Sequence, residues 1–269
     1  MTLRENGGTV NRGPRRTSIN RYVALGDSST EGLDDPDGEG GYRGWATRLA
    51  ERIATSQPDL LYANLAVRGY TTRQILETQL QPALDMCPDL VTLFSGTNDV
   101  VNRWSDALRL AEDIETMQRA LIGQGATLLT FTLPDLTTLM PAARWLAPRV
   151  EHLNQILREV SSRTGAVLVD LASYPVSRDP RLWSEDRFHA NALGHERIAA
   201  AFADVLGLPG ADDSWSTPLP VSPPLTFSAR AASELRWCRS HLLPWAWRRF
   251  TRRSLGDGRA AKRPVLQPL

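Results

Sequence analysis

Between residues 21 and 207, short apolar runs alternate with longer segments of helical period, and this alternation constrains the fold more than any other feature. It is typical of repeated βα units, which place parallel strands in one sheet and pack helices against it. The sequence therefore predicts an α/β fold with a five-stranded parallel sheet. The expected strands are residues 21–26, 60–66, 89–94, 126–131 and 166–170, and the expected helices are residues 44–54, 72–84, 105–122, 142–163 and 191–206.

Composition changes at the end of this region and suggests how the chain is divided. Residues 208–227 are rich in Pro, Ser and Gly, which predicts a linker. We expect one domain over residues 21–207, preceded by a basic N-terminal arm at residues 1–20. Residues 228–269 form a basic extension rich in Trp and Arg, in which Pro244 is expected to end a helix.

The net charge of +1 hides an uneven distribution of charge along the chain. Residues 1–21 carry +4 and residues 228–269 carry +8, which leaves −11 for residues 22–227. All basic residues except Lys262 are arginines, a bias to which we attach no functional meaning. An acidic body with two basic ends is the resulting picture.

Several classes of protein are excluded or disfavoured by the sequence. It has no run of eighteen apolar residues, and no apolar segment follows the charged start, so we expect a cytoplasmic protein. Cys87 and Cys238 lie far apart and match no zinc or disulfide pattern. The acidic run at 34–41 lacks the alternating ligands of a calcium loop. We therefore predict no metal and no cofactor.

Ser28 is the candidate nucleophile. It follows the first predicted strand in the segment GDSSTEG, where open α/β sheets place their reactive groups. A serine here can equally cap the next helix, and an isolated GDS would favour that interpretation. The nucleophile elbow GxSxG is absent, because Thr30 stands where the second glycine is needed.

Other candidate site residues follow later strands. Gly69 after the second strand can bring a backbone N–H close to a ligand, and Asn98 after the third can donate from its amide. Asp186 and His189 lie three residues apart just before the last predicted helix. Taken singly, Gly69 and Asn98 are ordinary turn residues.

Together these residues form a set suited to acyl transfer. His189 can take the proton of the Ser28 hydroxyl, and Asp186 can fix the tautomer of the imidazole. The backbone N–H groups of Ser28 and Gly69 and the amide of Asn98 can stabilise the negative charge that develops on a substrate carbonyl.

These blocks resemble the SGNH hydrolases, also called GDSL esterases and lipases. The matching blocks are GDS at 26–28, NLAVRG at 64–69, GTND at 96–99 and DRFH at 186–189, in the family's order within residues 22–201. The resemblance does not extend to the basic tail.

The resemblance implies a flavodoxin-like three-layer α/β/α fold and ester or thioester hydrolysis without metal or cofactor. It also implies a triad of Ser28, His189 and Asp186, with an oxyanion hole from Ser28, Gly69 and Asn98. We therefore predict a serine esterase acting on small or medium acyl esters through a covalent acyl-enzyme. A carbohydrate O-deacetylase or a thioesterase of the same fold is the alternative.

A few further residues were weighed for a role in the site. His152, His195 and His241 are assigned to packing or to the tail, because none has the loop position of His189. No basic cluster lies beside Ser28, which disfavours a strongly anionic substrate such as a CoA thioester. Apolar residues expected near the sheet's carboxyl edge can line an acyl pocket or simply pack, namely Trp104, Leu136, Leu139, Met140, Trp145 and Trp183.

The tail allows three interpretations. Its aromatic residues alternate with arginines, so it can dock on the acidic body, rest on an anionic membrane surface or bind nucleic acid. We rank these interpretations in that order, because the net charge of −11 on residues 22–227 can attract the net charge of +8 on residues 228–269 of the same chain. A membrane-surface or partner-binding protein that acts through its tail is thus the non-enzyme alternative. The residues concerned are Trp237, Trp245, Trp247 and Phe250, with Arg236, Arg239, Arg248, Arg249, Arg252 and Arg253.

Overall fold

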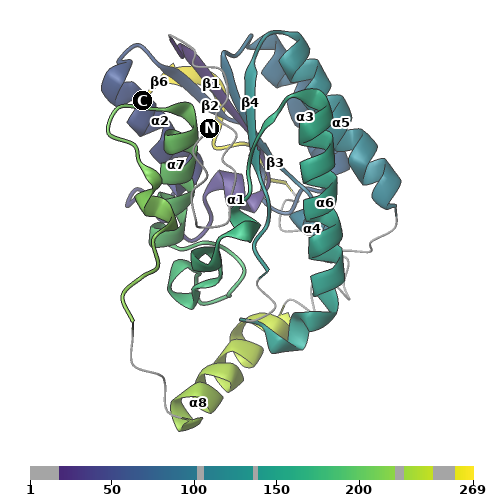
Figure 1. Cartoon of the computed structure of the whole chain (residues 1–269), viewed down its shortest axis with the longest axis vertical. Coiled ribbons are helices and arrows are strands. Elements are labelled where there is room, and N and C mark those ends of the chain that lie inside the picture. The colour runs from purple at the N-terminus through teal and green to yellow at the C-terminus, as the bar shows by residue number, and fades with distance from the viewer. Residues whose placement is uncertain (1–17, 102–105, 136–138, 222–226, 245–257) are drawn as a thin grey trace, which may run out of the picture.

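A computed structural model describes residues 18–101, 106–135, 139–221, 227–244 and 258–269. Within these residues, six strands form one sheet in the order β5-β4-β3-β1-β2-β6 (Figure 1). The first five are parallel and correspond to the five expected strands. Their bounds are β1 Arg21–Gly26, β2 Leu61–Asn64, β3 Leu90–Phe94, β4 Thr127–Phe131 and β5 Val167–Val169, with β6 at Arg263–Pro268.

Helices cover both faces of the sheet, which confirms the predicted three-layer fold. Figure 1 shows α2 and α7 on one side and α3 and α5 on the other. Alternate residues of β1 belong to the two cores: Tyr22 and Ala24 to one, Val23 and Leu25 to the other. The helices are α1 Ser28–Glu31, α2 Gly44–Ser56, α3 Thr72–Asp85, α4 Thr97–Val101, α5 Ala107–Gly123, α6 Ala147–Thr164, α7 Ala192–Leu206 and α8 Phe227–Trp237.

The sheet has one strand more than the five predicted parallel strands, because the end of the chain adds β6. It pairs antiparallel with β2, with Tyr62 opposite Gln267 and Asn64 opposite Arg263. Two of its residues, Pro264 and Pro268, cannot donate a backbone hydrogen bond, and proline in a strand is tolerated at an edge such as this one. The extension at 228–269 is therefore only partly helical.

Lys262 precedes β6 and reaches back to the loop that follows α1. Its Nζ donates to the carbonyl oxygens of Glu31, Tyr42 and Arg43 at 2.7, 2.6 and 3.0 Å. A compact ammonium with three donors fits such a group of carbonyls, whereas a planar guanidinium does not. The single lysine, to which the sequence analysis attached no meaning, thus fastens the C-terminal strand to a loop near Ser28.

Other parts of the predicted linker and tail also contact the domain. Within 208–227, Trp215 is buried and stacks obliquely on Tyr174, while Arg197 donates to its carbonyl oxygen at 2.7 Å. The segment 208–217 is therefore packed against α7. The N-terminal arm up to residue 17 and the Trp–Arg cluster at 245–257 lie outside the described residues.

None of the described helices combines the length and the apolar character that crossing a bilayer requires.

Replacing Lys262 by methionine is expected to lower the free energy of unfolding by about 1 kcal/mol, because charge-assisted hydrogen bonds at a partly exposed position are lost. Urea unfolding followed by circular dichroism measures this. Arg144→Met is the matched control, since it removes one positive charge from an exposed side chain. Equal stability of the two variants would contradict a stabilising role for the hydrogen bonds from Lys262 to the three carbonyl oxygens.

Candidate active site

Ser28 lies where β1 ends and α1 begins. A Cβ on Gly26 would lie 2.7 Å from the carbonyl oxygen of Phe94, so glycine is needed for β1 to pass this close to β3. The helix cap is Asp27, whose carboxylate accepts from the N–H of Ser29 at 3.0 Å. Ser28 is thus the first residue of the helix, and its hydroxyl is not needed as the cap.

The segment with Asp186 and His189 folds into a tight turn before α7. Asp186 Oδ1 accepts from the backbone N–H groups of Phe188 and His189 at 2.8 and 2.9 Å, and Oδ2 lies 2.6 Å from His189 Nδ1. Arg187 between them has φ +62°, in the left-handed region. The three-residue spacing therefore lets one carboxylate hold both the backbone and the ring of His189.

Ser28 and His189 meet although 161 positions separate them. Ser28 Oγ lies 2.8 Å from His189 Nε2. Because Nδ1 faces the Asp186 carboxylate and is its donor, Nε2 is left as the acceptor for the serine hydroxyl. The structure thus brings the three polar side chains singled out in the sequence into one hydrogen-bonded chain.

The electrostatics of these three hydrogen-bonded side chains favour an anionic Asp186 beside a basic imidazole. Burial opposes ionisation of Asp186, but the hydrogen bond and charge of His189 outweigh it and hold the Asp186 pKa well below its usual range. Burial likewise opposes protonation of His189, but Asp186, with smaller contributions from Asp34 and Asp27, raises the His189 pKa above its usual value. His189 is therefore a stronger base than an isolated histidine.

Two backbone donors lie open beside the serine. In the part of the chain that the structure describes, the N–H groups of Ser28 and Gly69 donate to no protein acceptor. Gly69 has φ +82°, which a residue with a side chain rarely adopts. These donors are therefore available for a substrate oxygen.

The amide of Asn98 is engaged in the unliganded protein. Its Nδ2 donates to Asp27 Oδ2 at 3.1 Å and to the carbonyl oxygen of Tyr70 at 2.9 Å. Burial raises the pKa of Asp27 to about 6, against the lowering effect of the Ser29 N–H. Asn98 is thus held at the site, but a substrate oxygen has to compete for its hydrogen.

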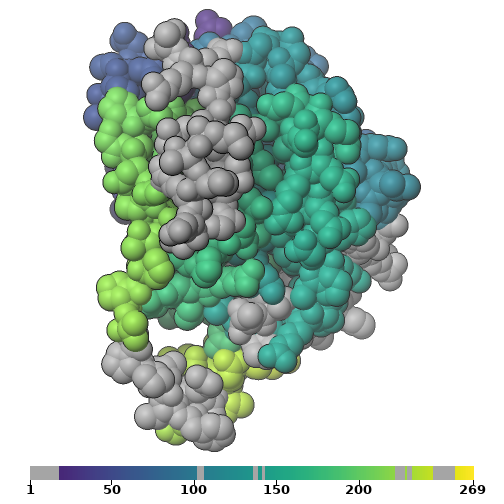
Figure 2. All heavy atoms as spheres, viewed as in Figure 1, coloured from purple at the N-terminus to yellow at the C-terminus, as the bar shows by residue number. Residues whose placement is uncertain are grey.

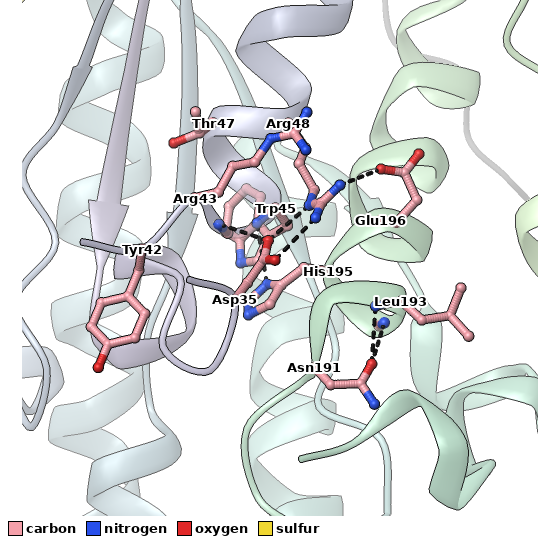
Figure 3. Close-up of polar contacts among 12 residues, drawn as sticks. Asp35, Tyr42, Arg43, Trp45, Thr47, Arg48, Asn191, Leu193, His195 and Glu196 are labelled. Atoms are coloured by element: carbon pink, nitrogen blue, oxygen red, sulfur yellow. Dashed lines mark hydrogen bonds and ion pairs between the residues drawn. The ribbon is translucent and has the colours of Figure 1, made fainter. Parts of the chain in front are cut away.

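His195 packs as expected and also holds a loop of the site. Its Nδ1 accepts from the Trp45 N–H at 3.1 Å (Figure 3). Its Nε2 donates to the Leu33 carbonyl oxygen at 2.9 Å. Burial lowers its pKa to about 4, so it is neutral at pH 7. Nearby, Arg48 binds both carboxylate oxygens of Asp35 at 2.8 and 3.0 Å. These contacts fix residues 33–35 beside Ser28.

A cavity of about 370 Å³ opens onto the site. His241, which the sequence assigns to the tail, lines this cavity together with other residues of the tail. Of the predicted pocket residues, Met140 and Trp145 line it, whereas Trp104 and Leu136 lie outside the described residues. A narrower space of about 60 Å³ lies on another side of Ser28, lined by Trp183 among others.

Arg43 and Arg68, which follow Ser28 in the sequence, are both paired with carboxylates. Arg68 binds Glu31 and lies over the ring of Tyr42, while Arg43 binds Glu51. Neither offers a free cation to an anionic substrate.

One group near the serine has the composition of a metal site. Ligand atoms of Asp34, Asp186 and His189 lie within 4.8 Å of one another. Both ring nitrogens of His189 are already hydrogen-bonded, to Asp186 and to Ser28, and neither is left to bind a metal ion.

Comparison with protein families identifies the chain. Residues 24–197 match the model of the GDSL-like lipase/acylhydrolase family. The chain belongs to this family. The protein is accordingly an ester hydrolase, and the resemblance read from its four sequence blocks is confirmed. A search of curated proteins found none that matches this GDSL-like acylhydrolase.

Solved structures share the fold of this acylhydrolase. A putative GDSL-like lipase from Parabacteroides merdae has a TM-score of 0.59 at 17% identity, covering 75% of this chain and all of its own. The lipase/acylhydrolase from Enterococcus faecalis has a TM-score of 0.56 at 22% identity, covering 72% and 99%. An acetylxylan esterase from Geobacillus stearothermophilus, Axe2, has a TM-score of 0.56 at 17% identity, covering 74% and 100%. These likenesses extend to the fold alone.

Histidine titration by NMR tests the electrostatics of the site. We expect the pKa of the His189 imidazole to lie above the usual value for histidine, and Asp186→Asn to lower that pKa, because the anionic partner is lost. His195, which is expected to titrate near pH 4, serves as the internal reference. A His189 pKa unchanged by Asp186→Asn would contradict the assigned interaction.

Proposed function

We propose that this acylhydrolase is a serine esterase that cleaves small or medium acyl esters through a covalent acyl-enzyme. The observation that carries the proposal is the hydrogen-bonded chain from Asp186 through His189 to Ser28, with distances of 2.6 and 2.8 Å. At its serine end lie the backbone N–H groups of Ser28 and Gly69, which have no acceptor among the described residues. A nucleophile, its base and the orienting carboxylate are the groups that acyl transfer requires.

In the first half of the proposed reaction, Ser28 Oγ attacks the ester carbonyl carbon while His189 Nε2 takes the hydroxyl proton. The carbonyl oxygen becomes an oxyanion, which the N–H groups of Ser28 and Gly69 and the amide of Asn98 stabilise. The C–O bond to the alcohol then breaks, and His189 returns its proton to the departing oxygen. The acyl group remains on Ser28.

In the second half, water takes the place of the alcohol. His189 removes a proton from the water as it attacks the acyl-enzyme, and the second oxyanion uses the same donors. Collapse releases the carboxylic acid, and the proton returns to Ser28 Oγ. Asp186 stays ionised throughout and stabilises the imidazolium, as its lowered pKa favours.

The charges around the site favour a neutral substrate. Arg43 and Arg68 are paired with Glu51 and Glu31, and Asp34 adds a carboxylate near His189. A CoA thioester is therefore disfavoured. The O-deacetylase alternative has the acetylxylan esterase as a structural neighbour, but the mostly apolar walls of the larger cavity favour a hydrocarbon group over a sugar.

Replacing Ser28 by alanine is expected to lower kcat for p-nitrophenyl acetate or butyrate by ~10⁶-fold, as removal of a serine nucleophile does elsewhere. Ser29→Ala, which removes the neighbouring hydroxyl, is the matched control and is expected to keep normal activity. Wild-type rates in the Ser28 variant would show that the nucleophile is misassigned.

Asn98→Ala tests the oxyanion hole. We expect kcat to fall by ~10² to 10³ while KM changes little, because the donor acts mainly in the transition state. Initial rates with p-nitrophenyl butyrate measure both constants. If kcat is unchanged, Asn98 serves only to bind Asp27 and Tyr70.

A further inference from the structure

The 370 Å³ cavity at Ser28 has walls from two parts of the chain. One wall is a 3₁₀ helix, η2 (Pro141–Leu146), with Met140 before it, and it supplies Trp145. The other wall is the end of α8 and the π-helical turn η7 (Cys238–Leu242), which supply Trp237 and Leu242. The volume falls in the range of small-molecule sites. The second wall lies outside residues 24–197, the part that matches the family.

The wall that the tail supplies is held against the loop that carries Asp186 and His189. Trp237 is 6% exposed, and its Nε1 donates to the Asp186 carbonyl oxygen at 2.9 Å. Arg187 binds Glu234 of α8 at 2.7 Å and lies over the ring of Trp237. Figure 1 shows α8 beside the start of α6, and Figure 2 shows the same segment at one end of the molecule. The wall is therefore fixed relative to His189.

The chemistry of the walls selects an apolar occupant. Trp145 is 51% exposed, so a chain lying in the cavity would remove aromatic surface from water. The one arginine of the catalytic loop, Arg187, is engaged by Glu234. The other space beside Ser28 measures about 60 Å³ and can hold only a small group.

We infer that the cavity lined by η2 and η7 is an acyl-chain site, and that the tail makes this esterase selective for acyl chains of medium length. This inference rests on the proposed function. At ~30 Å³ for each carbon, the volume that a water molecule occupies in the liquid, the cavity has room for about twelve carbons. Each methylene buried there is expected to raise kcat/KM about fourfold.

Two neighbouring leucines allow a matched test. Leu242 lines the cavity, whereas Leu243 is 63% exposed. Leu242→Trp fills the cavity and is expected to lower the octanoate-to-acetate ratio of kcat/KM for p-nitrophenyl esters by about tenfold or more. Leu243→Trp is expected to leave it unchanged. Thermal melts check that both variants fold. Trp145→Ala on the η2 wall is expected to lower the same ratio and provides an independent variant.

The outcomes separate this inference from the proposed function. The wild type can hydrolyse the acetate ester while neither Leu242→Trp nor Trp145→Ala changes the octanoate-to-acetate ratio of kcat/KM. That result overturns the acyl-chain site but leaves the proposed function intact. The same two variants are also assayed on alkyl acetates, in which the alcohol and not the acyl group is varied. If they change the dependence of kcat/KM on chain length for alkyl acetates but not for acyl esters, the acyl-chain site is also overturned. If the wild type cleaves no ester, the proposed function fails. Binding of p-nitrophenyl octanoate to Ser28→Ala, measured by tryptophan fluorescence, still tests the site, since adding Leu242→Trp must weaken it.

Discussion

The hydrogen bond between Asp186 and His189 organises the site from which the rest of the function follows. It holds the imidazole at the end of the loop before α7, while the glycine at the end of β1 places Ser28 within 2.8 Å of that ring. Neither element alone makes a nucleophile. The parallel sheet makes their meeting possible, because the loops after its strands gather at one edge.

The same edge explains why Gly69 and Asn98 lie near the serine. Each follows a strand next to β1, and both line the cavity at Ser28. Their states differ. The Gly69 N–H has no protein acceptor among the described residues, whereas the Asn98 amide is bound to Asp27 and Tyr70. Formation of a complete oxyanion hole therefore costs Asn98 at least one of its present partners.

Where the structure describes the tail, at residues 228–244 and 258–269, it contacts the domain differently from what net charge alone suggests. An acidic body and a basic tail lead one to expect arginines of the tail on carboxylates of the domain. At α8 the signs are reversed, since Glu234 of the tail binds Arg187 of the domain. Lys262 binds carbonyl oxygens rather than carboxylates. Local geometry, and not the summed charge, sets these contacts.

Much of the fold and site could be predicted because the signals are local. The five parallel strands are apolar runs, and Ser28 and His189 belong to short motifs with fixed spacing. The strand β6 could not be found, since Pro264 and Pro268 disguise it and its partner lies some 200 residues away. The position of His241 at the cavity could not be predicted for a similar reason: only the return of the tail brings it there. The engaged amide of Asn98 depends on side-chain geometry, which no spacing reveals.

A crystal structure of the protein inhibited by an octylphosphonate ester tests the proposed triad and its substrate most directly. The predicted result is phosphorus bonded to Ser28 Oγ, with the phosphoryl oxygen within hydrogen-bonding distance of the Gly69 N–H and the octyl chain between Trp145 and Leu242. Phosphorus on another residue would contradict the assigned nucleophile. An octyl chain outside the cavity would contradict the acyl-chain site.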